Sequence, residues 1–333
     1  MFSESLRDFL NKEVKGNIDK WESDHKIPRD IWKKMGDQGF LGLTYPEKYG
    51  GFDLDFFFEV ILFEEMSKMN SGGFVITQQV VQCMSSPYIL KYGSEELKEK
   101  YLPGIISGDL IGCIGITEPD AGSDVKSIKT KAEDKGDHYL LNGSKTFITN
   151  GVYGDFVVTV AKTDSKAGTK GISLIVVDLN SKGINRTKID KLGWHASDTA
   201  EISFDNVKVP KENLIGEEGK GFYYLMNGLQ LERLIFVPSC VGAMEFAISE
   251  SIKYMKQRKS FGQTIDKFQA LRHKIASLSS EIESAKVFGY YCCELYNKNI
   301  YDVKLCSIAH WDSSLFRLMI YFRKMTAITF VFE

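Results

Sequence analysis

The stretch that decides the fold lies between Asp137 and Val209. It contains four short segments: DHYLLNG (137–143), DFVVTVAKT (155–163), GISLIVVDL (171–179) and AEISFDNVKV (200–209). These segments are rich in β-branched and aromatic residues with a period near two, and Gly, Asn, Asp or Lys separates them. The pattern predicts a compact antiparallel β domain.

Helical periodicity flanks this stretch on both sides. Before it, apolar residues recur at spacings of three and four, as in Leu6, Phe9 and Leu10. After it, long amphipathic stretches at 243–257 and 268–296 are typical of a helix bundle. Because strands and helices are segregated, the order argues against a doubly wound dinucleotide fold. The sequence predicts an α+β protein with three parts: an N-terminal helical domain (1–110), a middle β-barrel domain (111–215) and a C-terminal helical bundle (216–333).

Composition limits the class of protein. The 333 residues are 43% hydrophobic and 26% charged, which excludes a disordered chain. A formal charge of -2 supplies no overall attraction for nucleic acid or for an anionic membrane.

Six cysteines without ligand spacing predict free thiols and no metal site. The start, MFSESLRDFL, has no apolar signal core, and no apolar run reaches the roughly 18 residues of a membrane span. A soluble intracellular protein, or the mature form of an imported one, is expected.

A loop of small and hydroxyl residues, IGITEPDAGSD, occupies positions 114–124. Its backbone N–H groups could approach a flat ring or a phosphate closely. Pro, Asp, Gly and Ser also form ordinary turns, so composition alone leaves both interpretations open.

A second segment, KTFITNG (145–151), places Phe147 and Thr149 two positions apart on a predicted strand. This spacing would put them on one face, where Phe147 could cover a cofactor ring and Thr149 could hydrogen-bond its edge. A core strand that ends in an Asn-Gly turn would have the same sequence.

Glu232 lies between apolar residues and beside Arg233 in LQLERL (229–234). A carboxylate among apolar neighbours can gain the basicity of a general base. A glutamate in the first turn of a helix, or one paired with Arg233, would give the same sequence pattern as a general base. Spacing does not separate these interpretations.

The segment QRKSFG (257–262), followed by Gln269, offers cations for phosphate groups. Gly262 would end a helix there, although a solvated helix end would look the same. His195 has no visible acid or nucleophile as partner, and Cys292-Cys293 lies in an apolar helical pattern. His195 is expected to be structural or peripheral, and the two cysteines are expected to be buried thiols.

Together these segments resemble the acyl-CoA dehydrogenase family of flavoenzymes. The resemblance spans the chain from its first helix to about Ala309. It is carried by ITEPDAGSD (116–124), NGSKTFITNG (142–151), SDTAE (197–201), GEEGKGFYYLM (216–226) and QRKSFG (257–262). The stretch GFYYLMNGLQLERL (221–234) looks closest to the long-chain branch, with the isovaleryl-CoA branch second.

The resemblance implies a homotetramer with one FAD per subunit. It implies a flavin-binding set: Ile114, Ile116, Thr117, Ser123, Phe147, Ile148, Thr149, Arg258, Phe261 and Gln269. It implies an acyl-CoA-binding set: Ser123, Tyr223, Gln230, Leu231 and Arg233. Within the first set, Arg258 and Gln269 would reach the FAD of a neighbouring subunit.

The resemblance also places the catalytic base at Glu232, because the two branches carry it directly before a matching Arg. The implied reaction is FAD-dependent α,β-dehydrogenation of a medium-to-long-chain acyl-CoA to the trans-2-enoyl-CoA, with hydride transfer to flavin N5, in fatty-acid β-oxidation. Electron-transfer flavoprotein would then reoxidise the FAD. The expected location is the mitochondrial matrix in a eukaryote and the cytoplasm otherwise. Gly72-Gly73 is compatible with a deep acyl pocket, or with a close helix crossing.

The chain departs from the family pattern after Ala309. The remaining residues lack the glycine-rich GG-x-G segment and the Gly-Thr flavin loop, so an incomplete bundle is expected. Loss of the loop's N–H donor to the thioester carbonyl would cost roughly 3 kcal/mol. The tail from Met325 is β-prone. Pro238 would kink the helix that carries Glu232, or delay the start of that helix.

The alternative function is a non-catalytic interaction module. An acyl-CoA oxidase is less expected, because it would have a larger chain.

Overall fold

A computed structural model gives the fold and describes residues 1–300, 302–311 and 313. The chain divides into two units: residues 1–15, 55–71 and 233 onward form one, and residues 16–54 and 72–232 form the other. The β-prone tail expected from Met325 lies outside the described residues, as does the end of the predicted C-terminal bundle. The domain boundaries at residues 110 and 215 stay a prediction.

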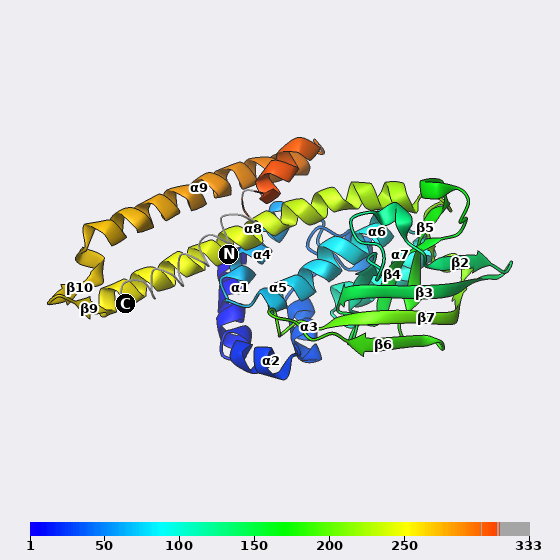
Figure 1. The fold of residues 1–333 in the computed structure, drawn as a ribbon, viewed down its shortest axis with the longest axis horizontal. Helices are drawn as coiled ribbons and strands as arrows, with labels where there is room; N and C mark the ends of the chain where they lie inside the picture. The colour runs from blue at the N-terminus through cyan, green and yellow to red at the C-terminus, as the bar shows by residue number, and fades with distance from the viewer. Residues whose placement is uncertain (301, 312, 314–333) are drawn as a thin grey trace. The chain divides into compact units, whose positions relative to one another are not determined.

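The elements follow the predicted order of helices, strands and helices (Figure 1). The helices are α1 (Phe2–Phe9), α2 (Ile18–Asp24), α3 (Arg29–Asp37), α4 (Phe57–Ser67), α5 (Gly72–Gln79), α6 (Ser86–Tyr92), α7 (Glu95–Ile106), α8 (Gly221–Gln257) and α9 (Gln269–Asn297). The strands are β1 (Gly112–Gly115), β2 (Lys131–Asp134), β3 (His138–Thr149), β4 (Phe156–Lys162), β5 (Ile172–Asp178), β6 (Ile184–Lys188), β7 (Thr199–Pro210), β8 (Leu214–Ile215), β9 (Lys259–Ser260) and β10 (Gln263–Thr264). The four quoted segments become β3, β4, β5 and β7, and the α+β class is confirmed.

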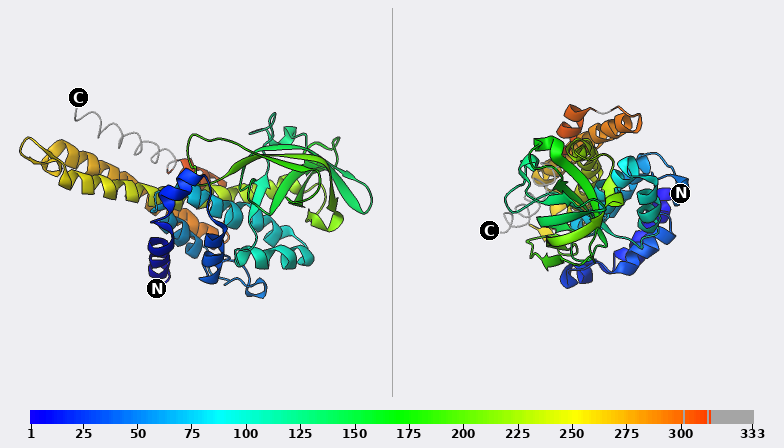
Figure 2. Two further views of the ribbon diagram at one scale, coloured as in Figure 1. Left: turned by 90° about the horizontal axis from the view of Figure 1, so that it is seen from below. Right: turned by 90° about the vertical axis from the view of Figure 1, so that its right-hand side faces the viewer.

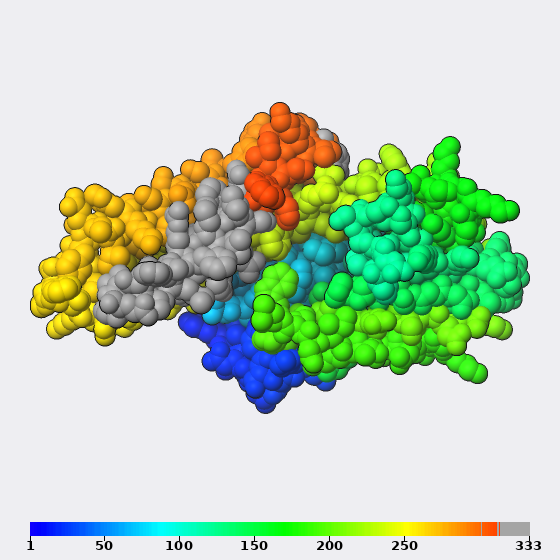
Figure 3. All heavy atoms as spheres, in the orientation of Figure 1, coloured from blue at the N-terminus to red at the C-terminus, as the bar shows by residue number. Residues whose placement is uncertain are grey.

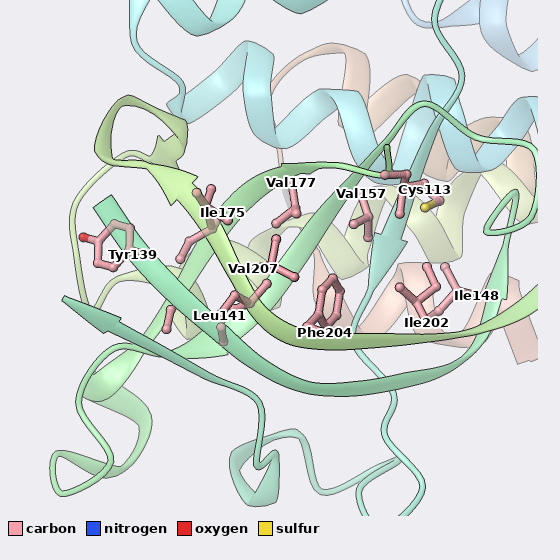
Figure 4. Close-up of a cluster of buried hydrophobic side chains, with 14 of the residues drawn as sticks. Cys113, Tyr139, Leu141, Ile148, Val157, Ile175, Val177, Ile202, Phe204 and Val207 are labelled. Carbon is pink, nitrogen blue, oxygen red and sulfur yellow. The ribbon is translucent and has the colours of Figure 1, made fainter. Parts of the chain in front are cut away.

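Strands β1 to β8 form one sheet. Its hydrogen-bonded order is β6-β7-β3-β2-β4-β5-β8, with β1 paired to β4. Most pairings are antiparallel as predicted, but β1 and β2 both pair with β4 in parallel. The sheet curves around a buried core to which Leu141, Ile202 and Phe204 contribute (Figure 4). Burial of one face fixes the strand register, because a one-residue slip would expose the whole apolar set.

Helix α5 begins with Gly72-Gly73, and the structure explains both glycines. A Cβ on Gly72 would lie 2.2 Å from Nε1 of Trp194. A Cβ on Gly73 would lie 2.8 Å from the backbone nitrogen of Ser197. The pair therefore permits the close approach of a loop. The neighbour is a loop and not another helix, so the helix crossing that the sequence also allowed is not what the glycines permit, and the deep acyl pocket stays a prediction.

Helix α8 continues through Pro238, and it begins at Gly221, so the proline does not delay its start. The part of α8 after residue 233 lies beside α9, as Figures 1 and 2 both show, and they share a core that includes Met244 and Ile282. A hairpin of β9 and β10 joins them.

The hairpin turn corrects one prediction. Helix α8 already ends at Gln257, so Gly262 does not end a helix. Gly262 and Phe261 are the two residues between the paired strands, with φ of 77° and 50°. Positive φ at both central residues is what a tight I′-type hairpin turn requires.

Two further predictions from the sequence concern the cysteines and membrane-spanning helices. All six cysteines are free and buried, as expected. Among the described residues, no helix combines the length and the apolar character that crossing a membrane requires. In the space-filling view, the residues of the middle β part form a continuous green surface (Figure 3).

Candidate active site

A buried ion pair holds the loop 114–124 against β3. The side chains of Glu118 and Lys145 are 5% and 0% exposed, and Oε1 lies 2.7 Å from Nζ. Lys145 also donates to the carbonyl of Ile116 at 3.1 Å, and Glu118 accepts from the backbone N–H of Thr130 at 3.0 Å. The loop is therefore fixed at its centre and is more than a surface turn.

The pKa values of both members of this pair are lowered, but for different reasons. Burial lowers the pKa of Lys145 to about 8, although Glu118 opposes this shift. Burial raises the pKa of Glu118, but attraction to Lys145 and hydrogen bonds outweigh burial and leave it below its ordinary value. Sequence reasoning missed the pair, because two residues 27 positions apart produce no periodic signal.

Phe147 lies beside this loop in an unusual conformation. The register of β3 against β7 shifts between Lys145 and Ile148, and Phe147 has φ of 61°. Phe147 is 67% exposed, whereas Ile148 is 3% exposed. The backbone N–H of Thr146 donates to the carbonyl of Thr117 at 2.9 Å, which joins the loop to the strand next to Phe147.

The shift in register bears on the prediction that Phe147 and Thr149 lie on one face of β3. Phe147 and Thr149 were expected to share a face because strands alternate, but the bulge interrupts that alternation between Lys145 and Ile148. Thr149 is half-buried, as are Ile114, Ile116 and Thr117, whereas Ser123 is exposed. An exposed aromatic residue, with half-buried threonines on the same strand and on the adjoining loop, suits one face and the edge of a heteroaromatic ligand.

The end of β3 is tied to two other segments. Asn150, with φ of 64°, donates from Nδ2 to the carbonyls of Thr77 (3.0 Å) and Gly112 (3.3 Å). Buried Asp198 accepts from the backbone N–H of Val152 at 2.6 Å, and burial raises the pKa of Asp198. The SDTAE segment therefore positions the strand that carries Phe147.

Glu232 lies in the fourth turn of α8. It is half-buried, and its Oε1 accepts from the hydroxyl of Tyr88 on α6 at 3.1 Å. The helix begins eleven residues earlier, at Gly221. The alternative of a glutamate stabilised by the helix N-terminus is therefore wrong, because that effect is confined to the first turn.

The other predicted residues are distributed over both units. In the unit with Glu232, Gln230 and Leu231 are half-buried and Tyr223 is 63% exposed. The residues Arg233, Arg258, Phe261 and Gln269 belong to the unit that contains residues 233 onward, where Phe261 is exposed in the hairpin turn and Gln269 begins α9. Sequence reasoning also missed Tyr88, which lies 144 positions before Glu232.

Three family models match successive parts of the chain. They are described as acyl-CoA dehydrogenase N-terminal domain (residues 1–109), middle domain (113–207) and C-terminal domain (219–317). With the fold, these matches define the class as flavin-dependent oxidoreductases that act on acyl thioesters. The chain belongs to the acyl-CoA dehydrogenase family, and it is an acyl-CoA dehydrogenase.

Relatives confirm the two branches named from sequence. The chain is 40% identical over 321 residues to the mitochondrial long-chain specific acyl-CoA dehydrogenase of Mus musculus. The aligned residues cover 95% of this chain and 74% of that protein. It is 36% identical over 309 residues to the mitochondrial isovaleryl-CoA dehydrogenase of Arabidopsis thaliana, covering 92% and 75%.

The cofactor is FAD. A solved glutaryl-CoA dehydrogenase from Mycobacterium smegmatis, in complex with FADH2, superposes with a TM-score of 0.92 at 26% identity, covering 98% of this chain and 83% of that one. The residues present fit a flavin, because Phe147 is an exposed aromatic residue, and the half-buried residues Thr117 and Thr149 offer hydroxyl groups on the adjoining loop and on the same strand. The reaction is therefore FAD-dependent dehydrogenation of an acyl-CoA.

Proposed function

We propose that this protein oxidises straight medium-to-long-chain acyl-CoA thioesters in fatty-acid β-oxidation, with Glu232 as the catalytic base. The observation that carries the assignment is the half-buried carboxylate of Glu232, which lies well inside α8 and is held by a buried tyrosine. Partial exclusion of water raises the reactivity of a carboxylate towards a weak carbon acid.

The chemistry proposed for Glu232 is proton transfer. Its carboxylate takes a proton from Cα of the thioester while the Cβ–H bond breaks, and the electron pair of the former Cα–H bond forms the new double bond. When bound, FAD accepts the hydride that leaves Cβ. Glu232 then holds the proton as a neutral acid, and trans-2-enoyl-CoA is the product. Holding base and substrate in one geometry supplies much of the rate.

The proposed flavin contacts follow from the resemblance and from the fit of the loop. Ile114, Ile116, Thr117, Ser123, Phe147, Ile148 and Thr149 would hold the isoalloxazine, and Arg258, Phe261 and Gln269 would contact the FAD of another subunit. For the acyl-CoA, the proposed contacts are Ser123, Tyr223, Gln230, Leu231 and Arg233. The exposed ring of Phe147 supports the first set, since an exposed aromatic in a strained conformation indicates a ligand site.

Anaerobic absorption spectroscopy tests the proposed function. We expect the purified chain to show a flavin band that bleaches on addition of octanoyl-CoA or palmitoyl-CoA, and less with isovaleryl-CoA or glutaryl-CoA. Bleaching only with a branched or dicarboxylic substrate would reject the chain-length assignment. A protein that binds no FAD would favour the non-catalytic alternative.

Phe147 provides a prediction about cofactor binding. Phe147→Gly should raise the free energy of unfolding of the FAD-free protein by about 1 kcal/mol, because glycine adopts positive φ without the Cβ clash. It should also weaken FAD binding about tenfold, since the ring no longer stacks. Urea unfolding and FAD fluorescence titration measure the two effects.

The matched control is Phe147→Ala, which removes the ring but keeps a Cβ at the same φ of 61°. It should weaken FAD binding equally with no gain in stability. Equal FAD affinity in all three proteins would remove Phe147 from the flavin site.

The partner, the assembly and the compartment are further parts of the proposal. We infer that electron-transfer flavoprotein reoxidises the FAD, and that the working form is a homotetramer. The Mus musculus relative is named a mitochondrial protein, which supports the mitochondrial matrix as the location in a eukaryote; in a bacterium the location would be the cytoplasm. Analytical ultracentrifugation of the FAD-loaded protein tests the assembly, and a stable monomer would reject it.

A further inference from the structure

Tyr88 and Glu232 meet inside one unit of the structure. Tyr88 lies in the first turn of α6 and is 2% exposed. Its hydroxyl is 3.1 Å from Oε1 of Glu232 and 3.5 Å from the carbonyl oxygen of Leu225. A hydroxyl has one proton to donate, and the charged, nearer carboxylate is the stronger acceptor. The tyrosine therefore donates to Glu232.

The helix that carries Glu232 is shaped for this contact. Gly228 lies one turn before Glu232 on α8, so both face the same direction. A Cβ on Gly228 would lie 2.1 Å from the hydroxyl oxygen of Tyr88 and 2.4 Å from its Cζ. Glycine inside a helix costs about 1 kcal/mol relative to alanine. Here the absent side chain leaves the space through which the phenol reaches the carboxylate.

The tyrosine remains a donor at working pH. Burial and the negative charge of Glu232 raise the pKa of Tyr88 far above its ordinary value. Tyr88 is therefore protonated whenever Glu232 is ionised. Removal of the Cα proton by Glu232 changes the charge of the acceptor but leaves the tyrosine proton in place.

We propose that Tyr88 is a positioning residue for the base: it holds Oε1 of Glu232 through a path opened by Gly228 and so fixes the direction in which Oε2 meets the substrate. This rests on the proposed role of Glu232. Tyr88 itself neither gains nor loses a proton in the reaction, and it also stabilises the ionised form of the carboxylate.

Tyr88→Phe tests the assignment with the FAD-loaded full chain. We expect kcat to fall about tenfold to a hundredfold with little change in KM, because orientation is lost and binding is not. The acid limb of the kcat/KM profile should move to higher pH, since a donor to the charged carboxylate has been removed. A loss of stability alone would not move that limb.

Three further variants and an infrared titration separate a positioning role of Tyr88 from a packing role. Gly228→Ala should reproduce both changes by displacing the ring, and adding it to Tyr88→Phe should cause little further loss of kcat. Tyr92→Phe, on the same helix, should leave both unchanged, because the Tyr92 hydroxyl accepts from Nδ2 of Asn227 at 3.5 Å and the ring of Tyr92 is kept. Infrared difference spectra against Glu232→Gln, recorded without substrate, should show the carboxylate band titrating at higher pH in Tyr88→Phe.

The outcomes separate the inference from the proposed function. If the unmodified protein is not bleached by any acyl-CoA, the proposed function fails. If Glu232→Gln retains full activity, the base assignment fails. If both of these hold but Tyr88→Phe changes neither kcat, nor the acid limb, nor the infrared titration, then Tyr88 is only a packing residue and the inference is overturned.

Discussion

Glu232→Gln should lower the rate of flavin bleaching by palmitoyl-CoA by about a thousandfold or more, close to the upper limit for a positioned general base. The amide has nearly the same shape as the carboxylate and can still accept a hydrogen bond from Tyr88, so α8 should fold as before. The amide oxygen is far too weak a base to remove a proton from Cα. Stopped-flow absorbance at the flavin band measures this rate.

Two companion variants sharpen this prediction. Glu232→Asp keeps the charge but shortens the side chain by one methylene, so we expect an intermediate rate. Glu201→Gln changes an exposed glutamate on β7 and should leave the rate unchanged. Bleaching of Glu232→Gln at the full rate would show that the base lies elsewhere in the chain.

The second large effect concerns stability. Lys145→Met should lower the free energy of unfolding by about 3–5 kcal/mol, because it leaves the carboxylate of Glu118 buried without its cation. Methionine fills a similar volume, so little of this loss comes from a cavity. Urea unfolding followed by tryptophan fluorescence measures the loss. Amide hydrogen exchange should also accelerate between residues 114 and 124, where the pair fixes the loop.

Removing both charges tests the cause of this loss. The double variant Glu118→Gln with Lys145→Met should recover a large part of the stability, since no charge remains buried. The amide oxygen could still accept from the backbone N–H of Thr130. Lys131→Met, at an exposed lysine on β2, should change stability little. An equal loss in the single and double variants would exclude the unpaired charge as its cause.

The pair also predicts a pH dependence. The pKa of Glu118 is lowered in the folded protein, so its contribution to stability is complete above the ordinary glutamate pKa. That contribution is lost as the pH falls through the lowered value, because the carboxylate then becomes protonated. Glu118→Gln should therefore reduce the acid-side slope of unfolding free energy against pH. An unchanged slope would assign the acid sensitivity to other carboxylates.

Much of the fold could be predicted because its signals are local. The periodicity of residues 155–179 specifies β4 and β5 directly, and the amphipathic spacing of 268–296 specifies α9 to within a residue at each end. The stretch 243–257 specifies only the last part of α8, which begins at Gly221. Local signals failed at Gly262, where the sequence suggested a helix end. The structure has a hairpin, because two consecutive residues with positive φ close a tight turn there.

The sequence alone determined the family, the cofactor class and the candidate base, because short motifs such as ITEPDAGSD and QRKSFG occur in a fixed order. Only the tertiary structure decided what surrounds them. Glu118 meets Lys145 across 27 positions, and Tyr88 meets Glu232 across 144. Such contacts depend on how the strands pair and on which helix faces which. A local pattern contains no information about a partner so far along the chain, so the positioning of the base became visible only in the folded protein.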